Sequence, residues 1–314
     1  MDILNILSKE YFVSGSLIAK RLKISRAAVH KQISALKSRG YGIISSKGTG
    51  YKLESDSTLL LESVLKQKLS NKNFSSLNYS FKHFNEVSST QSFAKQHALA
   101  LSDGTVIIAE TQSASYGRMG REWKSDLGGL WFSIILKPRL RPDEALSISL
   151  LTSLTLQSTL NAVYNMATSV KWPNDITFAG KKLAGIILEM AASQDLVNWL
   201  CVGVGINANN EAPAQFNATS LKGIFKKDID RSELLSNFLV NFANNYKKFK
   251  AEGFKPFQKN YNMSLGALNK QISVDTGGEI ITGTVCGADE NGHLVLNTGS
   301  KNVKIISGTV ISAV

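Results

Sequence analysis

Apolar and polar positions near the start of the chain follow the pattern of a small helical domain. Apolar residues recur at helical spacing in residues 1–8, again after Ser14, and again over Arg26–Ser38. Ser25 is a suitable N-cap for the last of these helices. Two helices joined by a turn of about three residues predict a helix-turn-helix motif, which the second and third stretches form.

A strand, a glycine-rich turn and a second strand are expected next, over residues 41–53, with the basic Lys47 near the tip. A helix-turn-helix followed by such a hairpin predicts a winged helix, which we place in residues 1–63. A three-helix protein-docking module is the alternative, because winged helices also serve as interaction domains. The stretch 55–75 is rich in Ser, Asn, Lys and Leu, and Leu59–Leu69 is expected to be a linker helix.

Strands and helices alternate from residue 80 onward, which predicts an α+β or α/β domain with a mixed sheet in residues 75–265. Residues 130–136 are apolar on both faces, as expected of a central strand. Residues 145–164 predict a long, mostly apolar helix. The other expected elements are a helix at 92–101 and strands at 81–84, 106–110, 169–171, 182–190 and 199–206.

The last part of the chain changes pattern once more. Residues 221–262 are expected to be rich in helix, and from Lys270 onward short apolar runs alternate with glycine turns. Short strands at this spacing predict a small β-barrel, which we place in residues 268–314. The chain as a whole is therefore predicted to be a multidomain α+β protein.

Composition and charge narrow the class of protein. The chain has 43% apolar and 19% charged residues, and no apolar run is long enough to span a membrane. Met1–Leu4 do not resemble a secretory signal, and Cys201 and Cys286 are isolated, so a cytoplasmic location is expected.

The net charge is +12, and the first 54 residues carry ten Lys and Arg against three acidic residues. This basic end predicts a nucleic-acid-binding module, with an ordinary solvated surface as the alternative.

Common nucleotide-binding and nucleophile motifs are absent from the sequence. There is no P-loop and no Gly-x-Ser-x-Gly elbow. The Ser-x-x-Lys matches at 34–37 and 92–95 lie on predicted helices. Gly203–Asn207 resembles a dinucleotide fingerprint but lacks its third glycine. The sequence therefore gives no support for a side-chain nucleophile and only weak support for NAD.

Polar clusters in the central domain carry the candidate chemistry. Arginines placed among glycines can bind phosphate or carboxylate while the backbone approaches closely, and an Asp held at a turn can coordinate Mg²⁺. A Lys before an apolar, glycine-containing strand suits an anionic head group above an apolar ligand. Each cluster alone also has an ordinary structural interpretation. The clusters are Ser88–Gln91, Gln112–Trp123, Lys171–Asp175 and Lys181–Glu189.

Taken together and in this order, the clusters resemble the bifunctional biotin–protein ligase and biotin operon repressor family over nearly the whole chain. Gln112–Trp123 contains a version of the family's Gly-Arg-Gly-Arg-x-Gly-Arg-x-Trp motif. Lys171–Asp175 matches Lys-Trp-Pro-Asn-Asp, and Lys182–Ile186 matches Lys-Leu-Ala-Gly-Ile. Gly203–Asn207 matches Gly-x-Gly-Ile-Asn, and Ser25–Val29 resembles the start of the family's recognition helix.

The resemblance implies a class II synthetase-like catalytic domain followed by an SH3-like C-terminal barrel. It implies a two-step reaction in which the biotin carboxylate attacks the α-phosphorus of Mg-ATP, giving biotinyl-5′-adenylate and pyrophosphate. A lysine of a biotin carboxyl carrier protein then attacks the mixed anhydride and releases AMP. The implied partners are biotin, ATP with Mg²⁺, the carrier protein, operator DNA and a second copy of the chain as a homodimer.

The resemblance also assigns the residues around biotin. Ser89, Thr90 and Gln112 are expected to bind the ureido ring or to flank biotin. Gly185 and Ile187 are expected to contact the biotin body through backbone and apolar surface. These five residues come from three separate segments of the sequence, so the assignment requires the fold to bring them together.

Charged residues are assigned to the phosphate side of the reaction. Arg118 is expected to hold the carboxylate and phosphate with help from Arg121, and Lys182 to neutralise negative charge in both steps. Arg118 and Lys182 are therefore the catalytic candidates. Trp123 is expected to pack on adenine, and Asp175 to help bind Mg-ATP.

The chain departs from the family motif at Ser115-Tyr116, which stand where the family usually has Gly-Arg. One hypothesis is that the loop closes less tightly and the adenylate escapes faster; the alternative is that Tyr116 covers biotin by stacking. Tyr116 and Gly117 are expected to contact substrate, while Met119 occupies a variable position. Asn207 is expected to line the nucleotide side.

The DNA-binding candidates lie on the outer face of the third predicted helix and at the hairpin tip. They are Arg26, Ala27, His30, Lys31 and Lys47. Three alternatives to a ligase and repressor stay open: a lipoate ligase-like enzyme, a repressor that senses biotin without catalysis, and a ligase whose winged helix does not bind DNA. The winged helix and Lys171–Asp175 argue against the first, and intact Arg118, Asp175 and Lys182 against the second.

Overall fold

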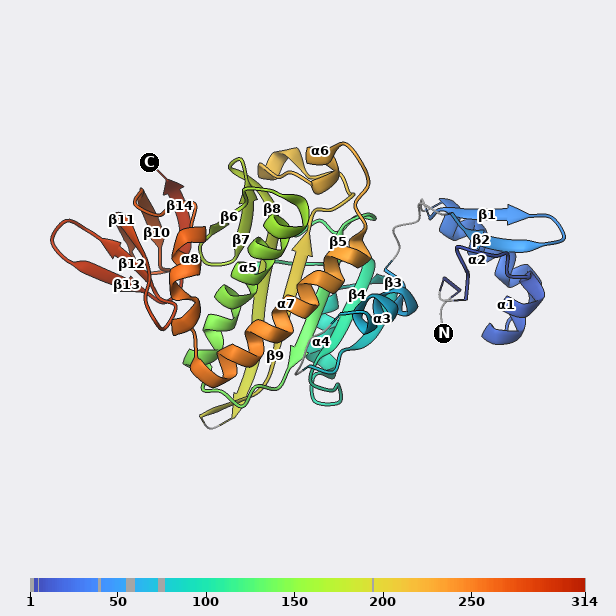
Figure 1. The fold of residues 1–314 in the computed structure, drawn as a ribbon, viewed down its shortest axis with the longest axis horizontal. Helices are drawn as coiled ribbons and strands as arrows, with labels where there is room; N and C mark the ends of the chain where they lie inside the picture. The colour runs from blue at the N-terminus through green and yellow to red at the C-terminus, as the bar shows by residue number, and fades with distance from the viewer. Residues whose placement is uncertain are drawn as a thin grey trace.

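The computed structural model describes residues 3, 4, 6–38, 41–54, 60–72, 77–193 and 195–313. Three parts follow one another along the chain and along the molecule (Figure 1). The N-terminal part lies beyond one edge of the central sheet, next to β3, and the C-terminal sheet lies beyond the other edge, next to β6. No helix within the described ranges is long and apolar enough to cross a membrane.

The N-terminal part is a winged helix. Helices α1 (Gly15–Leu22) and α2 (Arg26–Ser38) pack on a hairpin of β1 (Ile43–Ser46) and β2 (Gly50–Leu53). Ser14 caps α1, because its side chain accepts a hydrogen bond from the Leu17 backbone N–H. The helix-turn-helix and wing predicted from the sequence are therefore confirmed.

The helix expected over residues 1–8 is wrong for the part that the structure describes, which forms turns and irregular backbone. Its apolar residues are nevertheless buried, and Ile3 and Leu4 belong to the winged-helix core. So short a segment gains few backbone hydrogen bonds for the cost of nucleating a helix. Burial alone therefore accounts for its apolar pattern.

The central domain is built on a seven-stranded mixed sheet, as predicted. Its first two strands run parallel and the remaining neighbours are antiparallel. In sheet order the strands are β3 (Ser80–Val87), β4 (Thr105–Gln112), β5 (Leu130–Leu136), β9 (Leu196–Ile206), β8 (Lys181–Ser193), β7 (Asp175–Phe178) and β6 (Ser169–Lys171).

Helices cover both faces of this sheet. Alternate residues of β4 point to opposite faces of the sheet. Val106 and Ile108 belong to the large apolar core on one face, whereas Ile107 belongs to a smaller core on the other face, together with Ala94 of α4. Figure 1 shows α5 and α7 crossing the large-core face side by side. The helices of this domain are α3 (Glu62–Ser70), α4 (Thr90–His97), α5 (Pro142–Tyr164), α6 (Leu221–Phe225), α7 (Arg231–Glu252) and α8 (Gln258–Ser264), with short 3₁₀ turns at Arg118–Gly120, Ala214–Phe216 and Lys255–Phe257.

The C-terminal part is a five-stranded antiparallel sheet. It has no core of its own, because Ile272 and Leu294 belong to the same apolar cluster as the central domain. The chain beyond α8 is therefore packed firmly onto the domain that holds the candidate site. In sheet order its strands are β13 (Asn302–Ile305), β12 (Leu294–Asn297), β11 (Ile280–Ala288), β10 (Gln271–Asp275) and β14 (Thr309–Ala313).

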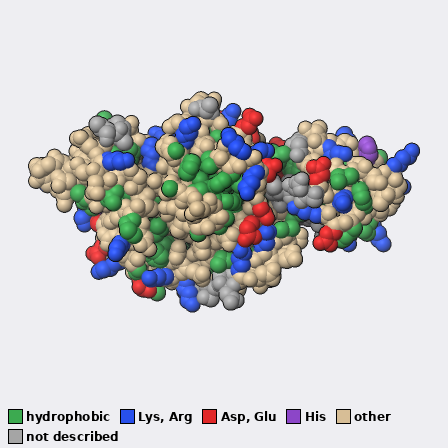
Figure 2. Space-filling view, turned by 45° about the horizontal axis from the view of Figure 1, so that its top comes forward, with side chains coloured by type: hydrophobic (Ala, Val, Ile, Leu, Met, Phe, Trp, Pro, Cys, Tyr) green, Lys and Arg blue, Asp and Glu red, His purple; other side chains and the backbone are tan. Residues whose placement is uncertain are grey.

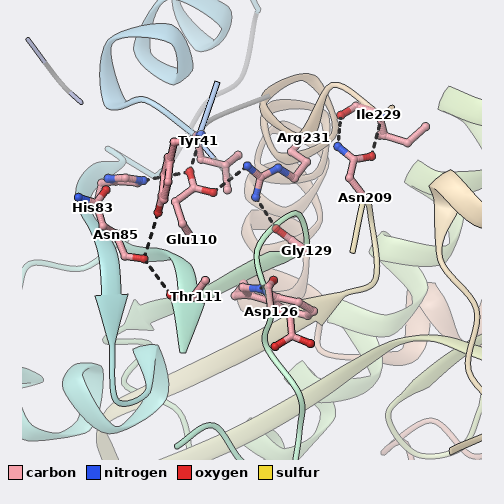
Figure 3. A network of polar contacts seen from close by, with 12 residues as sticks. Tyr41, His83, Asn85, Glu110, Thr111, Asp126, Gly129, Asn209, Ile229 and Arg231 are labelled. Atoms are coloured by element: carbon pink, nitrogen blue, oxygen red, sulfur yellow. Dashed lines mark hydrogen bonds and ion pairs between the residues drawn. The ribbon is translucent and has the colours of Figure 1, made fainter. Parts of the chain in front are cut away.

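A buried polar network joins the winged helix to the central domain (Figure 3). The carboxylate of Glu110 accepts hydrogen bonds from the Leu60 backbone N–H at 3.0 Å and from Arg231 at 2.7 Å, and lies 3.3 Å from His83 Nε2. Burial opposes ionisation of Glu110, but the charge of Arg231 and the contact with His83 lower its pKa to about 2. One carboxylate thus fixes the segment after the winged helix, β3 and α7 together.

Candidate active site

A cavity of about 570 Å³ lies where α4, β8 and the β4–β5 connection meet. Each residue expected to contact biotin, adenylate or Mg-ATP lines this cavity, although the residues are far apart in sequence. They are Ser89, Thr90, Gln112, Tyr116, Gly117, Arg118, Arg121, Trp123, Asp175, Lys182, Gly185, Ile187 and Asn207. The structure therefore brings the predicted set together in one place, and the role of each residue stays a prediction.

The polar floor of the cavity is built at the start of α4. The Thr90 backbone N–H donates to Gln112 Oε1 at 2.7 Å, and the Thr90 hydroxyl lies 3.0 Å from the Ser133 hydroxyl. Ser133 in turn donates to Gln91 Oε1, and Ser89 caps the helix by accepting from the Ser92 N–H. These buried hydroxyl and amide groups can recognise a small polar ring.

Two residues of this floor were not named as candidates from the sequence. Ser133 is the only polar residue in the strand Leu130–Leu136 and is fully buried, which was an available signal. Gln91 is also buried, and it lies in the Ser88–Gln91 cluster that the sequence did single out. Ser133 bonds to Thr90 and Gln91 of α4, and Gln91 also donates to the Cys201 carbonyl of β9, so the two residues hold the floor to the sheet.

The β4–β5 connection folds over the cavity as a hairpin, and we call residues 113–124 the lid. Tyr116 pairs with Glu122, the Gly117 N–H donates to the Arg121 carbonyl, and the Trp123 N–H donates to the Ser115 carbonyl. The turn at the tip requires left-handed backbone at Met119 and Gly120. The connection between β4 and β5 is therefore a hairpin with its own hydrogen bonds.

Trp123 lies on a surface made by two glycines of the neighbouring strands. A Cβ atom on Gly205 would lie 2.8 Å from the indole ring, and one on Gly185 would lie 3.0 Å from it. Lys182 Nζ lies 5.0 Å from the ring centroid, which is a cation–π distance. The indole N–H is buried and has no hydrogen-bond partner within the described residues. It is therefore a donor that a ligand in the cavity can use.

Lys182 and Asp175 form an ion pair at the other side of the cavity, with Nζ 2.8 Å from Oδ1. Antiparallel pairing of β7 with β8 produces this contact, because the register places Asp175 opposite Gly185 and Thr177 opposite Lys182. Both side chains are partly exposed to the cavity. A cation and an anion are thus available together for phosphate and metal chemistry.

Arg118 links the lid to the C-terminal sheet. Its guanidinium donates to the Asn174 side chain and to the Gly308 carbonyl at 3.2 Å. Burial lowers the pKa of Arg118, with Asp175 acting in the opposite direction, and a guanidinium remains charged at neutral pH. Thr309 and Val310 of the C-terminal part also line the cavity, although no residue of this part stood out in the sequence.

The DNA-binding candidates lie together on the outer surface of the winged helix. The side chains of Arg26, Ala27, His30 and Lys31 are exposed on α2, and Lys47 is exposed in the wing. Lysine and arginine side chains are visible over this end of the molecule in Figure 2. Within the described residues, this face holds no acidic side chain between Arg26 and Ser38, which suits a phosphate backbone.

Comparison with known proteins identifies these parts. Residues 84–207 match the Biotin/lipoate A/B protein ligase family, residues 1–52 match an HTH domain, and residues 267–311 match the Biotin protein ligase C terminal domain. The bifunctional ligase/repressor BirA of Bacillus subtilis is 31% identical over 98% of this chain and 97% of its own length, and that of Bacillus spizizenii is equally similar.

A solved structure supports the same assignment. The biotin protein ligase of Aquifex aeolicus in complex with biotin and ATP is 34% identical, with a TM-score of 0.65 over 74% of this chain and 97% of that one. The resemblance and the fold predicted from the sequence are confirmed by these relatives. The chain belongs to the biotin protein ligase family, among the bifunctional ligase/repressors that carry an N-terminal helix-turn-helix domain.

Proposed function

We propose that this protein uses ATP to join biotin to a lysine of a biotin carboxyl carrier protein through biotinyl-5′-adenylate. The observation that carries the proposal is the cavity itself, which has hydrogen-bonding groups at one end and the Lys182–Asp175 pair at the other. Gly185 pairs with Asp175, and Ile187 lies beside Gln91 across Gly203, so glycine backbone and apolar surface connect the ion pair to the polar floor. This arrangement matches the order of groups in biotin, which has a polar ring, then an apolar chain, then a carboxylate.

The first step needs charge neutralisation more than a nucleophile from the protein. Biotin carboxylate and the α-phosphate are both negative, so they approach only where cations offset their repulsion. Lys182 and Arg118 supply that charge in this proposal, and Arg121 assists. Burial raises the pKa of the Cys201 thiol well above its usual range, so it is a neutral hydrogen-bond donor to Gln91 and not a competing nucleophile.

Magnesium fits the cavity as a companion of the ATP phosphates. Within the described ranges no three His, Cys, Asp or Glu side chains gather into a cage. Mg²⁺ usually takes one or two carboxylates and fills its other positions with phosphate oxygens and water. Asp175 offers one such carboxylate, and Lys182 beside it can turn to the phosphates. Bound there, Mg²⁺ would supply positive charge to the triphosphate leaving group.

The polar floor favours biotin over lipoate. The ureido ring of biotin has both donors and acceptors for Thr90, Gln112 and Ser89, whereas a dithiolane ring has none of comparable strength. A lipoyl group would leave these buried groups without partners, which costs binding energy at each one. The floor thus separates the two substrates that this fold accommodates in different relatives.

The winged helix gives the second half of the proposed function, which is repression by binding operator DNA. Arg26, His30 and Lys31 would face the major groove from α2, and Lys47 would reach the backbone from the wing. We further propose that the DNA-binding form is a homodimer, since two copies would address two half-sites. A second copy is part of the proposal and rests on the resemblance to the repressor branch of the family.

A mass spectrum of a biotin acceptor domain tests the ligase directly. The domain is incubated with this protein, Mg-ATP and equimolar biotin and lipoate, and a parallel reaction omits ATP. A gain of one biotinyl mass on one lysine, present only with ATP, is the expected result. A lipoyl gain would instead assign the chain to lipoate ligation, and no gain despite tight biotin binding would leave a repressor that senses biotin without catalysis.

A further inference from the structure

Besides the packing of Trp123 against Gly185 and Gly205, the lid is held over the cavity by contacts at its base, at its tip and between the two. At the base, the backbone N–H groups of Ser113 and Ala114 donate to the carbonyls of Val87 and Ser88. At the tip, Arg118 reaches the C-terminal sheet. Between them the side chain of Tyr116 leaves the lid and meets a charged pair on the body of the domain.

That charged pair consists of Glu189 of β8 and Lys95 of α4. The Tyr116 hydroxyl donates to Glu189 Oε2 at 3.1 Å, and Glu189 Oε1 lies 2.5 Å from Lys95 Nζ. Lys95 Nζ also lies 5.9 Å from the centroid of the Tyr116 ring. The hydrogen bond to Glu189 raises the pKa of Lys95, which keeps its ammonium group charged beside the carboxylate. The hydroxyl therefore has a charged acceptor, which makes its hydrogen bond stronger than a neutral one.

The three side chains connect the elements that would enclose a ligand. Helix α4 supplies Thr90 to the polar floor, and β8 supplies Lys182 and Ile187 to the opposite wall. Lys95 and Glu189 lie further along the same two elements. A lid attached here cannot lift without separating Tyr116 from both walls. We propose that Tyr116, Glu189 and Lys95 form a latch that keeps the lid closed and sets how long biotin and its adenylate stay bound.

The latch matters because the tip contact conflicts with the proposed chemistry. Arg118 donates to Asn174 and to the Gly308 carbonyl, and it must release at least part of these bonds to neutralise a carboxylate and a phosphate. The base contacts are backbone bonds near the hinge and resist little rotation of the hairpin. Tyr116 therefore supplies, together with the packing of Trp123, a side-chain contact that persists while Arg118 turns to the ligand. Tyr116 is a positioning residue, and the inference rests on the proposed function only for the identity of the ligand.

Limited trypsin digestion of the full-length protein tests the latch without any ligand. The lid carries Arg118, Arg121 and Lys124 as cleavage sites, and the rate of cleavage reports the open fraction when opening is fast. Cleavage after Arg121, followed by mass spectrometry, should be about fivefold faster in Tyr116→Phe, as expected for a hydrogen bond to a partly exposed charged group. Glu189→Ala, which removes the acceptor of this bond, should behave in the same way.

The double variant and a matched control make the digestion decisive. If the hydroxyl acts through Glu189, Tyr116→Phe with Glu189→Ala should be cleaved no faster than either single variant, because either change alone removes the same bond. Tyr11→Phe removes the same hydroxyl from an exposed side chain of the winged helix and should leave lid cleavage unchanged. Unchanged cleavage in Tyr116→Phe, or effects of the two single changes that simply add, would overturn the latch.

The second measurement is the dissociation rate of biotinyl-adenylate formed from biotin and Mg-ATP. Tyr116→Phe should release it about fivefold faster and raise the KM for biotin. Faster cleavage with unchanged release would overturn the assigned effect on residence time. If the parent protein binds no biotin while digestion still follows the pattern above, the proposed function fails and the latch stands.

Discussion

Lys182 has two neighbours in the structure that bear on catalysis, the carboxylate of Asp175 and the ring of Trp123. Lys182→Ala removes the cation that is proposed to meet the biotin carboxylate and the α-phosphate. We expect adenylation to fall by at least about tenfold, since each loss of about 1.4 kcal/mol in transition-state stabilisation has that effect. Pyrophosphate exchange with biotin and ATP measures it, and an unchanged rate would remove Lys182 from the catalytic role.

Gly205 is the residue on which the position of Trp123 depends. Gly205→Ala would place a methyl group 2.8 Å from the indole, and such overpacking typically costs about 1–3 kcal/mol. We expect the indole to be displaced and the KM for ATP to rise about tenfold. Gly278→Ala is the control, because its added Cβ would meet nothing within 4 Å. Equal KM values in the two variants would contradict the role given to Trp123.

At the scale of single residues, the charged residues that the sequence motifs named line one cavity, and their roles stay predictions. Arg118, Asp175 and Lys182 stand out because their types and spacing match a recognisable chemistry. Ser133 is less visible, since one hydroxyl in an apolar strand has no pattern around it until the fold places it opposite Thr90. The partner of Tyr116 was also unpredictable, because Glu189 is 73 positions away.

Among the elements, α3 joins two apolar cores. Leu61, immediately before the helix, belongs to the winged-helix core, and Leu65 and Leu69 belong to the central core. The sequence predicted a helix here but presented it as a linker, since spacing alone does not say what a helix packs against. Lys68 and Lys72 also bond to Glu233 of α7, so the helix is part of the central body as well.

The buried ion pair of Glu110 and Arg231 joins β4 to α7, and we expect it to be the contact between elements that is most sensitive to substitution. Glu110→Gln would leave the Arg231 guanidinium buried beside a neutral group, and loss of one partner of a buried pair costs about 3–5 kcal/mol. Urea unfolding at neutral pH should show that loss. Glu279→Gln changes an exposed carboxylate on the C-terminal sheet and should leave the free energy of unfolding within about 0.5 kcal/mol of the parent value.

The same pair gives the protein a defined response to acid. The pKa of Glu110 is lowered to about 2 from a usual value of 4.5, so the folded state binds this proton less readily than the unfolded state. The stabilisation is complete above pH 4.5 and is lost as the pH falls toward 2. Glu233, whose pKa its bond to Lys68 also lowers to about 2, acts in the same window. Glu110→Gln should therefore flatten the decline in stability between pH 4.5 and 2 without abolishing it, and a slope equal to that of the parent would contradict the assignment.

Across the whole molecule, charge is distributed unevenly, and this predicts how salt acts on DNA binding. Removing one phosphate-binding cation should reduce the slope of log K against log salt by about 0.9. Lys31→Ala and Lys47→Ala should each produce such a reduction on a random-sequence DNA duplex, measured by fluorescence anisotropy. Lys301→Ala, an exposed change on the C-terminal sheet, should leave the slope unchanged. If Lys31→Ala and Lys47→Ala also leave it unchanged, the winged helix is a docking module and not a DNA-binding one.

The arrangement of the three parts was the least predictable feature. The sequence indicated a winged helix, a mixed sheet and a C-terminal set of short strands, each from local patterns. It did not indicate that Gly308 would accept a bond from Arg118 or that Val310 would line the cavity. Contacts between distant segments depend on shape, and periodicity carries no information about them.

That arrangement has a consequence for the protein as it is made on the ribosome. The cavity draws on residues from Ser89 to Val310, and at usual rates of synthesis roughly ten to forty seconds separate the two. The winged helix, by contrast, has its buried core residues once Leu61 has emerged. A nascent chain therefore has a folded DNA-binding module well before it has a finished pocket, and the number of such chains depends on the rate of translation.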